Sequence, residues 1–518
     1  MTHREIDIAS LDQFDPDGKY GAEVEGTKIL LIRDGAEVRA ISALCPHAGG
    51  PLAEGVRHNN RIVCPWHKAT FCIRTGALLA PPAVDPLARF DVRVDGQRVI
   101  VTFPAAEAKE KPLTTDGRRF VIVGSGAAGA VAAQTLREAG FSGSIVMLDR
   151  ENRVPYDRTL LSKYFLSGEP GDEKSPLQKQ SFYHRHRIER RTAEATRLQV
   201  NEHRIECADG SSVDYDAILL ATGGTPISPA LPGAGLGNVF LLRSRADADA
   251  ILAHAERSER AVILGASFIG MEVAASLRER GLNVTVVGKE KLPFEKQLGA
   301  EVGGALVSLH EQHGVEFRLD SEIAAIEGGP NACGVVLAGG EMIECDLVVI
   351  GFGVTPATTY ATGLARNEDG GIKVDAYLRA ADDVYAAGDI ACFPLRGDGA
   401  PVRVEHWRVA QQHGRVAALN MAGKSIRYDA VPVFWTIQYL KRVDYIGHAT
   451  EWDEIIVHGD LQKPEFLAYY IKNGAVIAGA GIDRDKDMAA LIELFSVRRE
   501  WSAEALGDSP SSVLAGLR

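Results

Sequence analysis

The sequence predicts a multidomain protein: a small all-β domain, an α/β region with two glycine-rich βαβ units, and a final α+β domain. Three observations support this fold class. The chain has 518 residues, which is too long for a single hydrophobic core. Short apolar strands separated by turn signals fill about the first hundred residues. Two patterns of strand, glycine turn and helix then begin at Arg119 and Ala261.

The first segment consists of short strands joined by tight turns. Two apolar runs within residues 28–42 are separated by Asp34 and Gly35, which is a hairpin signal. Two further strands within residues 92–102 flank another Asp-Gly turn. We therefore expect an all-β domain over residues 1–104.

Two mixed pairs of cysteine and histidine lie in this domain. Cys45 and His47 form a Cys-x-His pair, and Cys64 and His67 form a Cys-x-x-His pair. Two thiolates and two imidazoles suit a Rieske [2Fe-2S] cluster, in which the cysteines bind one iron and the histidines the other. A zinc site is the alternative, but zinc sites usually contain paired cysteines and paired histidines. The mixed pairs favour the iron-sulfur cluster.

The proline after each cysteine and the Trp66-His67 step resemble the ligand loops of the Rieske family. Lys68 departs from that pattern, because the family usually has glycine there, so the resemblance does not fix the loop conformation. Respiratory Rieske proteins carry an extra cysteine in each loop, and the matching positions here are Gly50 and Trp66. The resemblance is therefore to the ferredoxin-type branch, and it implies a potential toward the low end of roughly -150 to +300 mV.

Residues 105–116 combine proline, alanine and charge without an apolar period, so we expect a linker.

The overall composition limits the class of partner and the location of the protein. The formal charge of -12 argues against a nucleic-acid partner. No run of about 18 apolar residues occurs, and the first residues are too polar for a secretory signal. We expect a cytoplasmic protein with no membrane segment.

The first glycine turn follows a short apolar strand and precedes a helical pattern. It contains Gly124, Gly126 and Gly129. Such a turn brings backbone close to a pyrophosphate, and the following helix directs its N-terminus at that anion. The next strand ends at Asp149, which can accept hydrogen bonds from ribose hydroxyls. The pattern predicts a Rossmann-like dinucleotide site.

The second unit repeats this pattern with one change. Its turn contains Gly265, Ser267 and Gly270, so serine replaces the middle glycine. The position that matches the ribose acid holds Gly288, and Lys289 follows it. An acid would favour NADH and a cation would favour the 2′-phosphate of NADPH, so both nucleotides stay open.

Two dinucleotide units in one chain resemble the flavin-dependent pyridine nucleotide oxidoreductases, which bind FAD and NAD(P)H. Three later motifs occur in the order of that family, and they contain Thr222 with Gly223, then Gly353, then Asp389. The resemblance implies that Asp389 holds the ribityl chain of FAD. It covers residues 117–425 and implies an FAD-binding domain in two parts, 117–245 and 370–425, around an NAD(P)-binding domain at 246–369.

The stretch after Asp149 indicates which subtype of these oxidoreductases the sequence resembles. The redox-active Cys-x4-Cys of the disulfide reductases is absent. Residues 154–163 instead resemble the Pro-Tyr-x-Arg-x-x-Leu-Ser-Lys signature of oxygenase-coupled ferredoxin reductases and apoptosis-inducing factor. The resemblance implies that Arg158 contacts the flavin diphosphate and that Lys163 lies beside the isoalloxazine. It also implies that Glu272 neighbours both flavin and nicotinamide, so Lys163 and Glu272 form the predicted catalytic pair.

Residues 426–518 resemble the C-terminal interface domain of the same reductases. Trp435 would then stack near the flavin edge, and Trp407 would approach from the other side. We expect the stretch that begins at Ser509 to be a loose tail.

The whole order resembles the Rieske-containing branch of the apoptosis-inducing-factor-like reductases. It implies an enzyme that passes electrons from NAD(P)H through FAD to its own Rieske cluster and on to an unidentified acceptor, such as an oxygenase, a cytochrome, a quinone or a small molecule. An NAD(H)-binding redox sensor with low turnover is the alternative. A Rieske oxygenase would need a mononuclear iron triad in a region that the nucleotide folds already occupy. A monomer and a homodimer both stay open.

Overall fold

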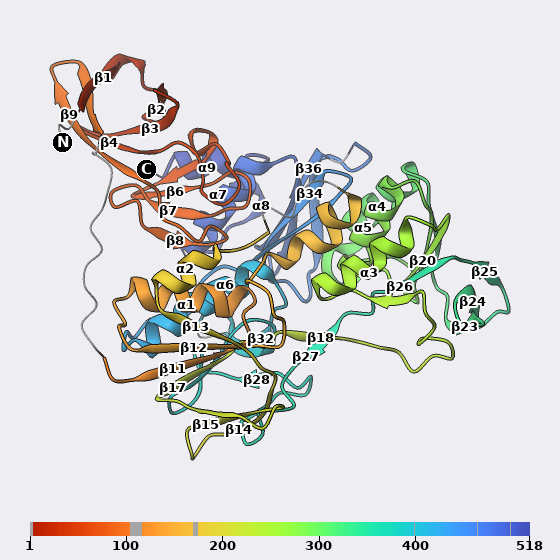
Figure 1. The fold of residues 1–518 in the computed structure, drawn as a ribbon. Coiled ribbons are helices and arrows are strands. Elements are labelled where there is room, and N and C mark those ends of the chain that lie inside the picture. Colours follow the sequence, from red (N-terminus) through yellow and green to blue (C-terminus); the bar gives the residue numbers. More distant parts are fainter. Residues whose placement is uncertain are drawn as a thin grey trace.

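The computed structural model describes residues 4–103, 116–168, 175–397, 399–463, 465–497 and 499–517 (Figure 1). The expected linker at 105–116 lies outside these residues except for its last position. Among the described residues, no helix is long and apolar enough to cross a membrane.

The N-terminal domain is all-β, as predicted, and contains two antiparallel sheets. β3 is buried on both of its faces: Leu30 and Ile32 pack toward the ligand loops, whereas Ile29 and Leu31 pack against the outer strands. The larger sheet has the order β1 (Arg4–Ser10), β10 (Arg98–Phe103), β9 (Arg89–Asp95), β4 (Glu37–Ser42), β3 (Thr27–Asp34) and β2 (Lys19–Val24). The smaller sheet has the order β5 (Val56–His58), β6 (Arg61–Val63), β7 (Thr70–Cys72) and β8 (Leu78–Ala80).

The first α/β domain is built on a mostly parallel sheet in which the strand side chains alternate between two cores. Phe120 and Ile122 face the helices α1 (Ala127–Glu138) and α6 (Trp407–Met421), whereas Val121 and Val123 face a small sheet. The main order is β13 (Ile188–Thr192), β12 (Ser144–Asp149), β11 (Arg119–Val123), β17 (Ala217–Leu220), β30 (Val384–Ala386) and β29 (Arg379–Ala381). The small sheet has β14 (Ala195–Gln199), β15 (Arg204–Cys207) and β16 (Ser212–Asp214); α2 (Gln180–Arg185) precedes β13, and β28 (Ile372–Lys373), β31 (Ala391–Pro394) and β32 (Pro401–Arg403) form a further sheet.

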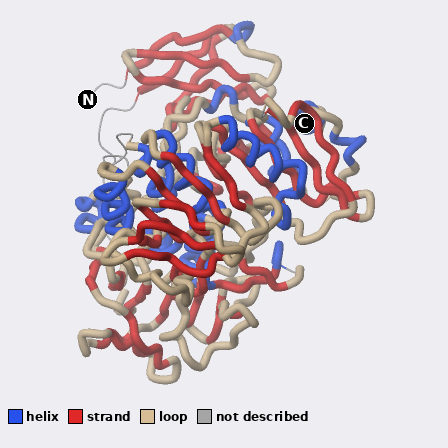
Figure 2. The backbone as a smooth tube through the Cα atoms, turned by 90° about the vertical axis from the view of Figure 1, so that its right-hand side faces the viewer, coloured by secondary structure: helices blue, strands red, loops and turns tan. Residues whose placement is uncertain are grey.

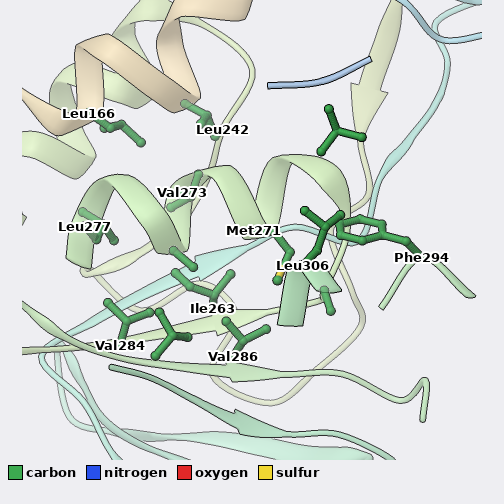
Figure 3. Close-up of a cluster of buried hydrophobic side chains, with 14 of the residues drawn as sticks. Leu166, Leu242, Ile263, Met271, Val273, Leu277, Val284, Val286, Phe294 and Leu306 are labelled. Carbon is green, nitrogen blue, oxygen red and sulfur yellow. The ribbon is translucent and has the colours of Figure 1, made fainter. Parts of the chain in front are cut away.

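The inserted domain is also an α/β domain, and it is built on a five-stranded parallel sheet. In Figure 3, Met271 of α4 (Phe268–Glu279) points toward Ile263 of the sheet, whereas Val273 points from the other side of the helix toward Leu242. The order is β19 (Val239–Leu241), β26 (Leu347–Ile350), β20 (Arg260–Leu264), β21 (Asn283–Val287) and β22 (Val315–Arg318), with α3 (Arg245–Ala255) and α5 (Glu295–Gln312). The remaining strands form a small sheet of β23 (Ile323–Gly328), β24 (Ala332–Leu337) and β25 (Met342–Glu344).

The limits of this insertion differ from the expected 246–369. Its sheet begins with β19, before residue 246, and its last strand β26 ends at Ile350. The chain then returns through β27 (Val354–Pro356), which pairs with β18 (Gly224–Pro226). Tyr360 packs in the core of the first α/β domain, because the segment after β27 already belongs to that domain.

The C-terminal domain is an antiparallel sheet with three helices. Its order is β33 (Val433–Gln438), β34 (Lys441–Gly447), β37 (Ala475–Ile482), β36 (Glu465–Lys472) and β35 (Glu454–Asp460), followed by α7 (Asp485–Ser496), α8 (Ala503–Leu506) and α9 (Pro510–Ala515). The expected loose tail is wrong, because proline begins helix α9 and Leu514 is fully buried.

The sheet of the C-terminal domain lies between two neighbours. One of its faces packs with α5 and α4 of the inserted domain, and the hydroxyl of Tyr470 donates to Leu298 O at 2.7 Å. On the other face, the core around α7 includes Val56 and Val63 of the N-terminal domain. Figures 1 and 2 both show the N-terminal sheets beside this domain. The N-terminal domain therefore packs directly on the rest of the protein.

Candidate functional site

A cavity of about 610 Å³ opens where three domains meet. The first glycine turn and Asp389 line it from the first α/β domain, Ser267 and Glu272 line it from the inserted domain, and Trp435 closes it from the C-terminal domain. Its volume is in the range of ligand sites. Both βαβ units therefore direct the start of their first helix into one cavity.

Two of the three glycines in the first turn leave no room for a side chain. Gly124 has a φ of +101°, and a Cβ there would lie 2.3 Å from Ala221 O. A Cβ on Gly129 would lie 1.9 Å from Gly124 O, so this glycine lets α1 pack against its own turn. Gly126 caps the helix and lines the cavity. The turn thus presents bare backbone and a helix N-terminus, which suits a pyrophosphate.

Asp149 ends β12 and lines the same cavity. Its carboxylate accepts from Glu151 N–H at 2.9 Å and from the hydroxyl of Ser125. Burial raises the pKa of Asp149. Ser125 lies between the first two glycines, and it orients an acid that can accept from ribose.

Two guanidinium groups lie along the cavity wall. Arg158 is fixed by Glu151 at 2.5 Å and donates to Arg243 O at 3.0 Å. Arg243 in turn pairs with Asp389 at 3.0 Å. Sequence reasoning did not find Arg243, because no glycine motif surrounds it and only the fold brings it to Asp389.

Glu272 is the centre of a buried polar cluster. Lys163 Nζ lies 2.8 Å from one carboxylate oxygen, and Ser162 Oγ donates to that oxygen at 2.5 Å. Thr436 Oγ1 donates to the other oxygen at 2.6 Å. Lys163 also donates to Thr159 O at 2.9 Å. The predicted pair therefore lies at the cavity with fixed orientation, and Ser162 and Thr436 complete its hydrogen bonds.

The second glycine turn tolerates its serine because that serine caps a helix. Ser267 Oγ accepts from Gly270 N–H at 3.1 Å at the start of α4. Gly265 has a φ of +104°, and a Cβ on Gly270 would lie 2.2 Å from Gly265 O. Gly265 and Gly270 do not line the cavity, and neither does Gly129; all three pack a turn against a helix.

The remaining motif residues shape the turns beside the cavity. Thr222 Oγ1 donates to Ala357 O at 2.7 Å, which ties two crossing segments together. Gly223 has a φ of +69°, and a Cβ there would lie 2.7 Å from a nitrogen of Arg243. Gly353 has a φ of +91° and also lines the cavity.

Both predicted tryptophans line the cavity. Trp407 is the first residue of α6, and its buried indole Nε1 has no hydrogen-bond partner in the part of the chain that the structure describes. Such a donor fits a polar ligand in the cavity. Trp435, on β33, lies with its ring centroid 5.5 Å from that of His67. One side chain therefore lies between the cavity and the N-terminal domain.

The four expected metal ligands lie as two pairs, one of histidines and one of cysteines. The Nδ1 atoms of His47 and His67 lie 3.1 Å apart. A hydrogen bond between the thiols raises the pKa of Cys45 and lowers the pKa of Cys64 to about 7. Among the described residues, no group of three or more His, Cys, Asp or Glu side chains could hold a single metal ion. Two thiols and two imidazoles on the same two loops instead fit a [2Fe-2S] cluster, with one iron on each pair. A Cβ on Gly50 would lie 2.7 Å from Cys64 Sγ, so the first loop also needs glycine there.

This fold and site define an oxidoreductase with a flavin site, a nicotinamide site and a fused Rieske domain. The chain belongs to the pyridine nucleotide-disulphide oxidoreductase family, whose model matches residues 118–414. The Rieske [2Fe-2S] domain matches residues 4–91, and the reductase C-terminal domain matches residues 433–515. These matches confirm the predicted fold class and the expected cofactors, which are FAD, NAD(P)H and a [2Fe-2S] cluster rather than zinc.

Named relatives cover most of the chain. Apoptosis-inducing factor 3 from Mus musculus is 34% identical over 91% of this chain and 80% of its own length. Rhodocoxin reductase from Rhodococcus erythropolis is 33% identical over 75% of this chain and 92% of its own length. These relatives confirm the resemblance to ferredoxin reductases and apoptosis-inducing-factor-like proteins.

Solved structures agree with this assignment. The ferredoxin reductase for the CYP199A2 system of Rhodopseudomonas palustris has a TM-score of 0.74 and 27% identity over 78% of this chain and all of its own. A chain of the covalent putidaredoxin reductase-putidaredoxin complex has the same TM-score and identity over 77% of this chain and 98% of its own.

Proposed function

We propose that this oxidoreductase passes electrons from NAD(P)H through FAD to its own Rieske cluster, and from the cluster to a separate redox acceptor. The observation that carries the proposal is the position of Trp435. Its side chain lines the cavity, and its ring lies 5.5 Å from that of the cluster ligand His67. Contact of one residue with both the cavity and a cluster ligand supports a short route between the two proposed redox sites.

The site residues have proposed roles in three groups. When bound, FAD accepts a hydride and can release electrons singly, which is the chemistry that the chain itself lacks. The proposed FAD contacts are Gly124, Gly126, Asp149, Arg158, Thr222, Gly223, Asp389, Trp407 and Trp435, whereas Gly129 shapes the turn without lining the cavity. The proposed nicotinamide contacts are Ser267 and Gly353, beside a turn that Gly265 and Gly270 shape, and the proposed cluster ligands are Cys45, His47, Cys64 and His67.

Lys163 and Glu272 are the proposed catalytic pair. Their ion pair fixes a positive charge at the cavity wall, where it would favour negative charge on a bound flavin. Ser162 and Thr436 hold the carboxylate of Glu272, so its position does not depend on the ligand. This arrangement orients a nicotinamide that enters at the start of α4.

The acceptor is proposed from the names of the relatives. Several are ferredoxin reductase components, for example of an anthranilate 1,2-dioxygenase system from Burkholderia cepacia. The match covers 97% of that relative and 75% of this chain. We propose that the Rieske domain here takes the place of a ferredoxin, so an oxygenase or a cytochrome is the favoured acceptor. We propose a cytoplasmic location and either a monomer or a homodimer.

A redox sensor is the second candidate, because apoptosis-inducing factor 3 is among the named relatives. A sensor would bind NAD(H) and change its shape or oligomeric state while it turns over slowly with every acceptor. Turnover with an artificial acceptor therefore separates the two candidates.

The test is anaerobic reduction of the purified protein with NADH and, separately, with NADPH. Flavin absorbance and low-temperature EPR are followed together. The proposal expects the flavin to bleach and a Rieske-type signal to appear, and the faster nucleotide is the preferred donor. A bleached flavin beside an intact oxidised cluster that stays EPR-silent would contradict the proposal.

A further inference from the structure

The second ligand loop, residues 64–69, has the same backbone form as the first ligand loop, residues 45–50. In the first loop, Cys45 N–H donates to Gly50 O and Gly49 N–H donates to Cys45 O, both at 2.9 Å. In the second, Cys64 N–H donates to Ala69 O at 2.8 Å and Lys68 N–H donates to Cys64 O at 3.2 Å. Lys68 thus stands where the first loop has Gly49.

Lys68 holds this position against a conformational cost. Its φ is +63°, and the φ of Gly49 is +78°. A left-handed conformation is unfavourable for a residue with a side chain, whereas glycine adopts it freely. A lysine at this position therefore needs a compensating contact.

That contact reaches outside the N-terminal domain. Lys68 Nζ lies 2.8 Å from Asp444 on β34 and 3.3 Å from Asp485 at the start of α7. It also donates to Trp66 O at 3.2 Å and to Pro65 O, so one ammonium ties its own loop to the C-terminal domain. Lys68 is 0% exposed and Asp444 is 2% exposed. Because both charges are buried, each depends on the other, and the pair therefore restricts where the loop can lie.

The backbone of the same residue is held from a second side. Arg408, in the first turn of α6, donates to Lys68 O at 3.0 Å and to Pro81 O at 2.8 Å. Arg408 follows Trp407, which lines the cavity. The second ligand loop is therefore fixed to both α6 and β34, beside the contact between His67 and Trp435.

We propose that Lys68 is a positioning residue that fixes His67 beside Trp435, so that electrons pass from the flavin to the cluster without movement of the Rieske domain. This inference rests on the proposed function. Other contacts hold the domains together, including Arg61 with Glu493 at 3.0 Å. Loss of Lys68 should therefore loosen the loop rather than separate the domains.

The test uses the holoprotein with Lys68→Gly. Glycine keeps the backbone conformation, and Asp444 keeps Arg442 at 3.2 Å, so neither strain nor an unpaired buried charge is added. Two measurements are made: amide hydrogen exchange of residues 64–69, and the rate of cluster reduction after NADH has reduced the flavin. The matched control is Lys441→Ala. Lys441 lies on β34, as Asp444 does, but it pairs with Asp483 away from the loop.

We expect faster exchange in residues 64–69, unchanged exchange in residues 45–50, and cluster reduction slowed by about tenfold, because only part of the population would hold the competent geometry. Flavin reduction by NADH and the EPR signal of the dithionite-reduced cluster should match those of wild type. Asp444→Asn should slow the same step, and the double variant should be no slower than the slower single variant.

The proposal requires both faster exchange in residues 64–69 and slower cluster reduction in Lys68→Gly. Either of these two changes without the other contradicts it. Wild-type transfer in a loosened loop would show that the position of His67 does not limit the rate. Slow transfer in a rigid loop would show that the charge of Lys68 acts in another way. If NADH never reduces the wild-type cluster, the proposed function fails and this inference fails with it, whereas a failure confined to Lys68→Gly leaves the proposed function intact.

Discussion

The two ligand loops of the Rieske domain share one backbone template and differ in what surrounds them. In the first loop Pro46, Ala48 and Gly49 are exposed, and glycine takes the left-handed position. In the second loop Pro65 and Lys68 are buried, and lysine takes that position. The template only needs one residue with positive φ four places after the cysteine, so the side chain there is free to form an interface. The second loop accordingly packs against β34 and α6 beside the cavity.

A third turn of the domain provides the sharpest test of which loops bind metal. Gly76 N–H donates to Cys72 O at 2.8 Å, as in the ligand loops, but no histidine accompanies Cys72. We expect Cys64→Ser to abolish the cluster and Cys72→Ser to retain it. Iron and sulfide analysis with EPR decides this. Loss of the cluster in both variants would contradict the assignment, and flavin reduction by NADH should survive in each.

The next effect concerns the nicotinamide side of the cavity. Glu272→Gln removes the negative charge that pairs with Lys163 while it keeps a side chain of the same size. We expect flavin reduction by NADH to slow about 100-fold, as when one preorganised polar group is lost from an active site. Stopped-flow absorbance measures the step. Glu279→Gln, on the exposed end of the same helix, is the control, and equal rates in both variants would remove Glu272 from the mechanism.

Trp435→Leu tests the ring contact between the second ligand loop and the cavity, which the first ligand loop lacks among the described residues. We expect cluster reduction to slow about tenfold, which corresponds to about 1.4 kcal/mol in the barrier. Flavin reduction should change less than cluster reduction. Trp452→Phe is the control, because Trp452 packs against Tyr470 and does not line the cavity. A wild-type rate of cluster reduction in Trp435→Leu would contradict the proposed route.

The smallest expected effect is on stability. Burial lowers the pKa of His406 and His310 to about 4 and that of His413 to about 3. An unfolded histidine has a pKa of about 6.5, so below that pH the unfolded chain binds protons that the folded chain does not. We expect the midpoint of thermal unfolding to fall as pH decreases from 6.5 to 4. A midpoint that rises over this interval would show that these imidazoles are protonated in the fold.

Local patterns predicted much of the fold and the site. The ligand pairs and both glycine turns depend on residues within a few positions of one another, so spacing alone identified them. The partners of these groups lie far away in the sequence: Thr436 is 164 residues from Glu272, and Lys68 meets Asp444 through domain packing. No sequence pattern connects such pairs. The short strand β19 and helix α9 were missed because their stability comes from tertiary contacts rather than from local periodicity.

The proposed function requires that one chain contains the whole route from flavin to cluster. The most direct test is single-turnover reduction by NADH under anaerobic conditions, with the rate of cluster reduction measured over a wide range of protein concentration. We predict a first-order rate that does not change on dilution, because the Rieske domain is already packed beside the cavity. A rate that falls in proportion to protein concentration would show that electrons pass between molecules, and it would contradict the account.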